Sequence, residues 1–291
     1  MTSATTRVLD PRLPALVSSR DFLAPAVDRA VATLRLPAGA WVLDAGTGAS
    51  GALPALARAG RAAGRVRAVD LDPNLAPMAA AHVDRAGMTA RVVVETADLL
   101  TVLDTAATDP AGGFDAIWAG DVVEPGTFVD PAATVAAMAR ALRPDGVVAL
   151  FTSNYHQSSF LVGHSRLERL VRAASAHRWN LPPDGPHHHD RQLHWLLSAG
   201  LDDVSLQVVP RVAFPLGGDS AARAYLEHTV WPEMLCSAAD SGRQVGMTAA
   251  EHDELRALIT PGSRRYIVDE PGYHLHQPTL LATGRRRGGR R

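Results

Sequence analysis

Three aspartates stand at the ends of short apolar segments in the first hundred residues of the chain. Asp44 ends "AWVLD", Asp70 ends "RVRAVD" and Asp98 follows "VVVETA". The glycine-rich stretch "GTGASG" begins just after the first of them. Glycine lets the backbone approach a ligand closely, and a carboxylate accepts hydrogen bonds from hydroxyl and amine groups. We therefore expect one ligand site that combines a glycine loop with three acids.

The glycine loop fits two kinds of ligand. Read literally, "GTGASG" is G-x-G-x-x-G, the fingerprint of a dinucleotide-binding βαβ unit. A dinucleotide presents a pyrophosphate to that loop, and the carboxylate of Asp44 would repel it. S-adenosylmethionine carries a sulfonium cation, an ammonium group and no phosphate, so acids attract it. Asp70 alone would suit NAD equally well, but the set of three acids favours S-adenosylmethionine.

Methyl transfer from such a ligand is an in-line displacement, in which much of the catalysis comes from holding the two reactants in line. A general base is needed only when the nucleophile arrives protonated. Asp121, after "FDAIWAG", is the first candidate for a base or an acceptor-orienting group. His156 is the second, because neutral histidine takes up protons near pH 7, and Tyr155 is a candidate contact to the acceptor. A carboxylate that caps a turn and an ordinary loop histidine are the alternatives.

Two histidine-containing stretches suggest further roles. "HHHD" at 187–190 invites a metal site, but consecutive histidines point in different directions and no second ligand cluster stands at a closing spacing. We expect no metal there and take Asp190 as a helix N-cap. Tyr225, His228 and Trp231 recur every three residues, which places them on one helix face. We expect His228 and Trp231 to contact the acceptor, with core packing as the alternative.

The elements that must position these residues alternate along the chain. Between residues 40 and 155, apolar β-like runs alternate with alanine-rich helical stretches, which is typical of a parallel α/β sheet. In such an open sheet, ligands bind at the carboxyl ends of the strands. Strands are expected at 40–46, 65–72, 90–98, 114–121, 143–153, 204–214 and 273–284. Helices are expected at 53–60, 75–87, 131–142, 165–179, 191–200, 220–239 and 248–259.

From about residue 20 to 284, the chain resembles the class I S-adenosylmethionine-dependent methyltransferases. "VLDAGTG" resembles their first motif, "AVDLDP" their second-strand acid motif and "ETADLL" their third-strand motif. "FDAIWAGD" is similar to their fourth strand and "ALRPDGVVAL" to the entry to their fifth. "LHWLLSAGLDDVSLQ" and "PTLLATGRR" resemble the regions of the sixth and seventh strands. The resemblance implies a Rossmann-like α/β fold: a seven-stranded, mostly parallel sheet with an antiparallel last strand and helices on both faces.

The resemblance also implies S-adenosyl-L-methionine as the cofactor. Its contacts are expected from the glycine loop and the strand ends, namely Asp44, Gly46, Thr47, Gly48, Asp70, Leu71, Asp98, Leu99, Ala119 and Gly120. Two departures from the family pattern occur. Asp145 replaces the first glycine of a P-G-G turn, where aspartate is tolerated, and the third glycine of the first motif is displaced to Gly51. Neither change removes the two glycines closest to the expected cofactor.

We expect a single methyltransferase domain over residues 1–284. It divides into an N-terminal helical segment (1–39, with a helix at 21–34), a cofactor-binding core (40–212), a helical lid insertion (213–270) and the last strand (271–284). The insertion is too long for a plain turn and has its own helical pattern. Residues 285–291, rich in arginine, are expected to form a disordered basic tail.

Composition limits the partners. The formal net charge of -1 gives no basic footprint for nucleic acid, and no apolar run is long enough to span a membrane. Cys236 is the only cysteine, so no internal disulfide can form, and the N-terminus has no secretory signal; both favour the cytoplasm. A homodimer is compatible with the sequence.

The sequence therefore predicts an enzyme that moves a methyl group from S-adenosylmethionine to an O, N or C atom of a small apolar or aromatic molecule, such as a secondary metabolite or quinone. Two alternatives stay open. One is a dinucleotide-dependent oxidoreductase. The other is a protein of the same fold that binds S-adenosylmethionine but catalyses different chemistry, or serves as a binding module.

Overall fold

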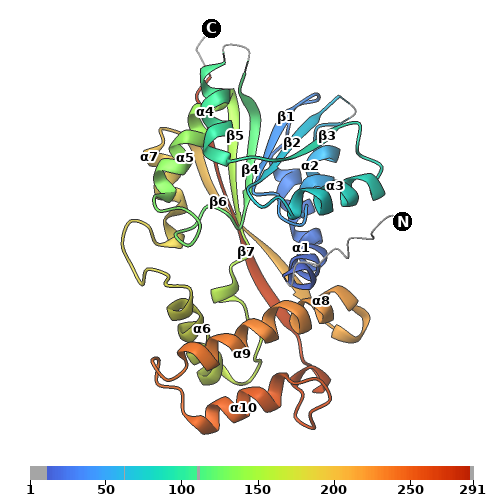
Figure 1. The fold of residues 1–291 in the computed structure, drawn as a ribbon, viewed down its shortest axis with the longest axis vertical. Helices are drawn as coiled ribbons and strands as arrows, with labels where there is room; N and C mark the ends of the chain where they lie inside the picture. The colour runs from blue at the N-terminus through green and yellow to red at the C-terminus, as the bar shows by residue number, and fades with distance from the viewer. Residues whose placement is uncertain (1–11, 62, 110–111, 289–291) are drawn as a thin grey trace, which may run out of the picture.

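A seven-stranded sheet forms the centre of the protein (Figure 1), in a computed structural model that describes residues 12–61, 63–109 and 112–288. The strand order is β3-β2-β1-β4-β5-β7-β6. The first five strands run parallel, and β7 is antiparallel to both β5 and β6. This topology confirms the expected Rossmann-like sheet with an antiparallel last strand. The strands are β1 (Trp41–Ala45), β2 (Arg65–Asp70), β3 (Val92–Thr96), β4 (Phe114–Gly120), β5 (Leu142–Thr152), β6 (Asp202–Ala213) and β7 (Leu275–Arg285).

Helices cover both faces of the sheet. Successive side chains of a strand point to opposite faces, so Val42 joins one apolar cluster and Leu43 the other. Because both faces are buried, the central strands read as nearly continuous apolar runs. The first face is covered by α1 (Leu13–Thr33), α2 (Leu53–Ala59) and α3 (Leu75–Arg85). The second is covered by α4 (Leu99–Thr108), α5 (Pro131–Arg140) and α7 (Gln192–Ser198).

Beyond the end of β5, β6 and β7 continue as a two-stranded ribbon toward a second group of helices (Figure 1). This helical layer consists of α6 (Ser165–Arg178), α8 (Ser220–Tyr225), α9 (Trp231–Ser241) and α10 (Ala249–Ile259). Although α6 precedes β6 in the sequence, it packs on α9, where Glu233 accepts hydrogen bonds from Ser175 Oγ at 3.0 Å and Arg178 Nη1 at 2.8 Å. The layer is therefore built from two separate segments of the chain, not from residues 213–270 alone.

Three helices differ from the sequence expectation. The N-terminal helix begins at Leu13 instead of residue 21, with a proline in its first turn, where the missing N–H costs nothing. The helix α4 was not expected. The expected helix 220–239 is interrupted by a π-helical turn, η4 (Leu226–Val230), before Pro232, whose ring prevents a regular helical hydrogen bond. Short 3₁₀ turns lie at η1 (Tyr155–Gln157), η2 (His189–Arg191), η3 (Leu216–Gly218) and η5 (Ile267–Asp269).

The start of the expected basic tail is held in place. Arg285 ends β7, and its side chain donates to Leu34 O and Asp145 O, both at 3.1 Å. Arg287 pairs with Asp202 at 2.8 Å. The prediction of a disordered tail from residue 285 was therefore wrong for Arg285 and Arg287, because the backbone and side-chain hydrogen bonds of β7 extend past Gly284. The last part of that tail, residues 289–291, lies outside the described residues, as does the N-terminal stretch 1–11.

Candidate functional site

The loop between β1 and α2 turns close to the segment that follows β4. Gly46 and Gly48 have φ angles of 68° and 50°, a region that favours glycine. A Cβ on Gly46 would lie 2.3 Å from Val122 Cγ2, so a side chain at this position would collide with that residue. The Thr47 amide donates to Val69 O at 2.9 Å and ties the loop to β2. The loop thus needs glycine at Gly46 for its own packing.

Asp70, at the end of β2, is fixed against this loop. Its Oδ2 accepts a hydrogen bond from the Gly48 amide at 2.8 Å, and its Oδ1 accepts one from the Asp72 amide at 3.0 Å. Each carboxylate oxygen can accept a further hydrogen bond. The acid is therefore held in one orientation and keeps the capacity to bind hydroxyl groups of a ligand.

Asp44 lies deeper, with a relative exposure of 3%. Burial raises the pKa of its carboxyl to about 7; the charge of Asp70 adds to the rise, and a 2.7 Å hydrogen bond from Thr47 Oγ1 opposes it. A cation bound nearby would favour the ionised form and lower this pKa. The site is thus better matched to a positively charged group than to a phosphate.

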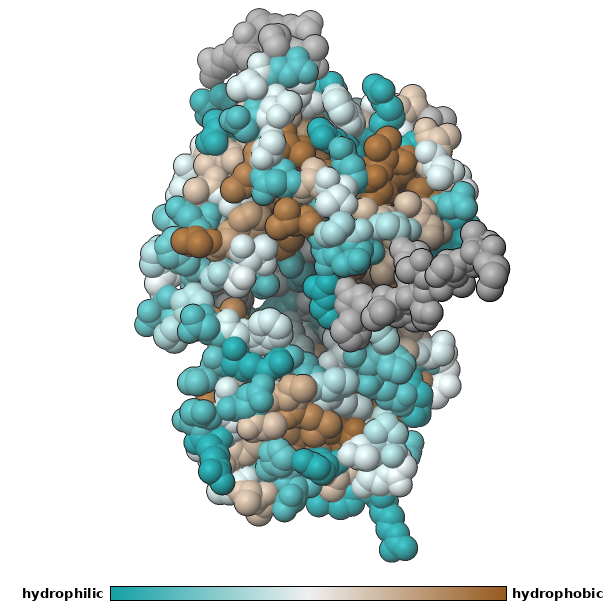
Figure 2. Space-filling model, viewed as in Figure 1, coloured by the Kyte–Doolittle hydropathy of each residue, from teal (hydrophilic) through white to brown (hydrophobic). Residues whose placement is uncertain are grey.

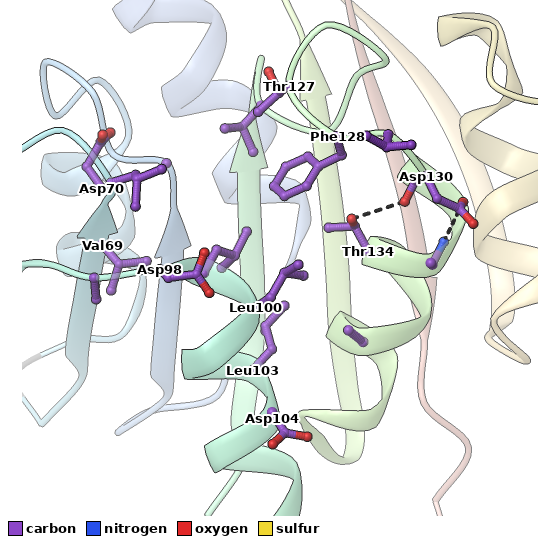
Figure 3. A pocket seen from close by; sticks show the side chains of 18 of the residues that line it. Val69, Asp70, Asp98, Leu100, Leu103, Asp104, Thr127, Phe128, Asp130 and Thr134 are labelled. Atoms are coloured by element: carbon purple, nitrogen blue, oxygen red, sulfur yellow. Dashed lines mark hydrogen bonds between the residues drawn. The ribbon is translucent and has the colours of Figure 1, made fainter.

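A cavity of about 810 Å³ opens beside Asp70 (Figure 3). In this view Asp70 and Asp98 lie at one end, and Leu100 and Leu103 of α4 face Phe128 across the cavity. The space-filling view shows apolar side chains gathered on the upper part of the molecule (Figure 2). The predicted cofactor residues that line this cavity are Gly46, Asp70, Leu71, Asp98 and Leu99. An apolar cleft with acids at one end suits a flat ring that carries polar substituents.

Asp98 has a structural role that the sequence reading did not assign. Its Oδ1 accepts hydrogen bonds from the Thr101 amide at 2.8 Å and from Thr101 Oγ1 at 2.9 Å, so it is the N-cap of α4. The "D-L-L-T" spacing was the signal for this missed helix. The cap holds the carboxylate at the wall of the larger cavity.

A second cavity of about 150 Å³ lies on the other side of the glycine loop. Asp44, Thr47, Gly48, Gly120 and Asp121 line it, together with Ser19 and Arg20 of α1. The guanidinium of Arg20 reaches toward Ala49 O at 3.5 Å, and its side chain is 12% exposed. Two acids and an arginine therefore line one small cavity. The sequence reading missed Arg20 because no motif connects α1 to the glycine loop.

Asp121 follows β4 in a left-handed backbone conformation, with φ of 53°. Its Oδ1 accepts a 2.6 Å hydrogen bond from the Ser153 amide, at the end of β5. Loss of solvation in the crevice raises the pKa of Asp121 to about 6, against the effect of the bonds to Ser153. Burial and the charge of Asp121 raise the pKa of nearby Glu124 to about 6 as well. Both carboxyls therefore titrate near neutral pH. Ala119, also in the predicted set, is buried within β4.

Tyr155 and His156 lie on η1, just after β5, but line neither cavity. Their rings meet edge to face at 5.4 Å, and Tyr155 also contacts Phe160 at 5.3 Å. The Tyr155 hydroxyl has no hydrogen-bond partner among the described residues, and burial raises its pKa above the ordinary value. Tyr155 is thus half-buried beside the site, with its hydroxyl oxygen enclosed.

The shared helix face of Tyr225, His228 and Trp231 does not form. Trp231 is buried, with its Nε1 donating to Tyr266 Oη at 3.3 Å, whereas His228 is exposed on the helical layer. The π turn between α8 and α9 adds to the residues per turn and so changes which face each side chain occupies. Tyr225 instead stacks on Phe22 of α1, with 4.4 Å between ring centroids.

The "HHHD" stretch forms the turn η2. His188 caps this turn, because its Nδ1 accepts from the Asp190 amide at 3.2 Å. The prediction that Asp190 caps the following helix was wrong, because the N-cap residue of α7 is Arg191, which makes no side-chain cap hydrogen bond. Over residues 12–61, 63–109 and 112–288, no group of three or more His, Cys, Asp or Glu side chains is arranged to hold a metal ion. In the same ranges, no helix is both long and apolar enough to cross a membrane.

Comparison with known proteins places residues 42–146 in a family described as a methyltransferase domain. A ubiquinone biosynthesis O-methyltransferase of Xanthomonas axonopodis pv. citri is 32% identical over 177 residues, which cover 58% of this chain and 66% of that protein. Its namesake in Xanthomonas oryzae pv. oryzae is 34% identical over 152 residues, or 52% of this chain and 56% of that protein. The chain thus matches between 56% and 66% of these relatives' length.

Two solved structures show the same fold at low identity. A putative methyltransferase from Bacillus halodurans gives a TM-score of 0.50 at 17% identity, over 90% of this chain and 98% of that one. The [4+2]-cyclase SpnF gives 0.51 at 17% identity, over 91% and 81%. At this identity the likeness concerns the fold alone.

Proposed function

Because the chain belongs to the class I S-adenosylmethionine-dependent methyltransferases, we propose that it transfers a methyl group from S-adenosylmethionine to an O, N or C atom of a small apolar or aromatic molecule. The observation that carries the proposal is the pair of cavities joined at Gly46, which lines both. One is mainly apolar with several acids in its lining, and the other is lined by two acids and an arginine.

The larger cavity fits the adenosine half of the cofactor. Asp70 binds the ribose hydroxyls, because its oxygens are fixed by the Gly48 and Asp72 amides and accept further bonds. Leu71, Leu99 and Phe128 enclose the adenine ring, with the carboxylate of Asp98 beside its amino group. The volume of about 810 Å³ leaves ample room for this half.

The smaller cavity fits the methionine half. Asp44 attracts the ammonium and sulfonium charges, and Arg20 binds the carboxylate through its planar fork of N–H donors. The part of the ligand between these charged ends is approached by Thr47, Gly48 and Gly120, and the two glycines leave space for it. A dinucleotide would place phosphates against Asp44 and is the poorer match.

The methyl acceptor lies beyond Asp121. S-adenosylmethionine supplies an activated methyl group on its sulfonium. Asp121, held by the Ser153 amide, orients the acceptor and takes the proton when the attacking atom is protonated. His156 is the second candidate for that proton. The names of the Xanthomonas relatives support an aromatic acceptor attacked through oxygen.

Incubation of the protein with methyl-labelled S-adenosylmethionine and a set of hydroxylated aromatic molecules tests the proposal. We expect the label to appear in an acceptor and S-adenosylhomocysteine to be released. Titration calorimetry should show that S-adenosylhomocysteine binds to the protein. Binding of the cofactor with no transfer to any acceptor would favour a different reaction on the same fold. Tight binding of NADH, with no response to S-adenosylhomocysteine, would exclude the methyltransferase function.

A further inference from the structure

A fully buried amide side chain, Gln277, projects from β7 with one of its polar atoms unpaired. Its Nε2 donates to Ser153 O at 2.6 Å, and the amide also interacts with the Tyr225 phenol, where it opposes the rise in pKa that burial causes. Its Oε1 has no partner in the part of the chain that the structure describes. Buried polar atoms are rarely left unpaired, and one near a functional site calls for a ligand or a water.

The amide is connected to Asp121 through a single peptide unit. The Ser153 amide donates to Asp121 Oδ1 at 2.6 Å, while Ser153 O accepts from Gln277. Burial raises the pKa of the Tyr225 phenol, and the charge of Asp121 adds to the rise, so the two groups interact electrostatically. These groups come from β4, β5, β7 and α8, at the carboxyl ends of β4 and β5. Ligands bind at this edge of an open α/β sheet.

Tyr225 lies next to the Gln277 amide and packs on two aromatic rings. Its ring stacks on Phe22 of α1 at 4.4 Å and lies 6.4 Å from the ring of Phe160. It is the last residue of α8 before the π turn Leu226–Val230, and such turns are frequent at functional sites. Because α1 also supplies Arg20 to the smaller cavity, Tyr225 packs on the same helix that reaches the proposed cofactor site.

We propose that Gln277 is a positioning residue for the methyl acceptor: its Oε1 accepts a hydrogen from an O–H or N–H group of that molecule and holds the group beside Asp121. The inference rests on the proposed function. Gln277 is fully buried in this structure, so the acceptor must displace the Tyr225 side chain to reach it. Since an amide oxygen only accepts hydrogen bonds, the pair selects molecules with a hydrogen donor over their methylated counterparts.

The test uses the protein saturated with S-adenosylhomocysteine and two matched probes, 4-fluorophenol and 4-fluoroanisole, followed by ¹⁹F NMR titration. Only the first probe can donate a hydrogen bond. We expect the wild-type protein to bind 4-fluorophenol about tenfold more tightly, the effect of one hydrogen bond. Gln277→Met removes this preference, whereas Gln277→Glu keeps it, because a carboxylate also accepts.

Thr279→Val is the matched control. Thr279 is buried two residues further along the same face of β7, and its Oγ1 donates to Val209 O, away from the Gln277 amide, so the variant keeps the preference. Equal binding of the two probes by the wild type, or no binding of either, overturns the inference, as does a full preference in Gln277→Met. If Gln277→Met no longer binds S-adenosylhomocysteine, the test rests on Gln277→Glu. Loss of the preference for 4-fluorophenol in that variant then overturns the inference. A wild-type protein that fails to bind S-adenosylhomocysteine contradicts the proposed function instead.

Discussion

The amide of Gly48 donates to the carboxylate of Asp70 at 2.8 Å, so the acid at the end of β2 holds the glycine loop that follows β1. Two residues that the sequence assigns to one ligand are thus bonded to each other before any ligand arrives. This contact makes the loop and the acid a single preformed unit. It also means that a change at Asp70 acts on the loop as well as on the ligand.

Asp70→Ala should weaken S-adenosylhomocysteine binding by about 1.5–3 kcal/mol, because it removes a charge-assisted contact to the ribose. It should also lower the melting temperature of the free protein, since the Gly48 amide loses its partner. Titration calorimetry and thermal unfolding measure the two effects. Asp84→Ala, on the exposed side of α3, serves as control. An unchanged dissociation constant would mean that another group binds the ribose.

Arg20→Met should weaken S-adenosylhomocysteine on the order of 10- to 100-fold, the value of one charged hydrogen bond. The affinity for 5′-methylthioadenosine should stay the same, because that nucleoside has no amino-acid carboxylate. Arg29→Met changes the next arginine of α1, which donates to Pro210 O, and should affect neither ligand. Equal losses for both nucleosides would show that Arg20 supports the fold rather than the carboxylate.

Gly46→Ala should destabilise the free protein by several kcal/mol, because its Cβ collides with Val122 and the backbone there is left-handed. Gly48→Ala should cost only about 1 kcal/mol, since no atom lies within 4 Å of its Cβ position and backbone strain alone opposes it. Chemical denaturation without ligand compares the two. Val122→Ala should recover part of the loss in Gly46→Ala and none in Gly48→Ala.

The stability of the free protein should depend on pH through Asp44. Its folded pKa of about 7 is raised above the ordinary value of 3.8, so between these values the folded state binds more protons than the unfolded chain. Stability from this group therefore falls as the pH rises from 4 to 7. Asp44→Asn should remove that fall and be more stable than wild type at pH 8, by at most about 4 kcal/mol.

The same carboxyl should make ligand binding pH-dependent in the opposite sense. Wild-type affinity for S-adenosylhomocysteine should increase from pH 6 to pH 8, because the ammonium of the ligand pairs with the ionised form of Asp44. Asp44→Asn should bind more weakly and with little change over this range. Calorimetry at the two pH values tests this, and a flat wild-type profile would argue against contact between Asp44 and the ligand.

Asp121→Asn should slow methyl transfer to a hydroxylated acceptor by about 10²-fold or more, as removal of a general base does. Asparagine tolerates the left-handed backbone at this position, so the fold and the cofactor affinity should be preserved. For the wild type, kcat/KM should rise from pH 5 to pH 7 as the carboxyl of pKa about 6 ionises. The variant should lack this rise. An undiminished rate would leave His156 as the base to examine.

The meeting of the strand-end acids with the glycine loop could be predicted from the sequence for a physical reason. Parallel strands end at the same edge of a sheet, so acids that terminate consecutive β runs, such as Asp44 and Asp70, must lie near one another. The glycine loop and the alternating elements are local patterns, and local patterns are what a sequence displays. The same local patterns predicted the seven strands, whereas the antiparallel direction of the last one was implied only by the resemblance to the methyltransferase family.

Only the tertiary structure placed residues that are distant in the sequence. Arg20 and Gln277 stand more than two hundred residues apart, and no spacing connects them to the glycine loop or to Asp121. His228 and Trp231 separate because one π turn changes the phase of a helix, and α6 packs on α9 although β6 lies between them in the chain. These relationships depend on how distant segments bury their surfaces together, which no local pattern records.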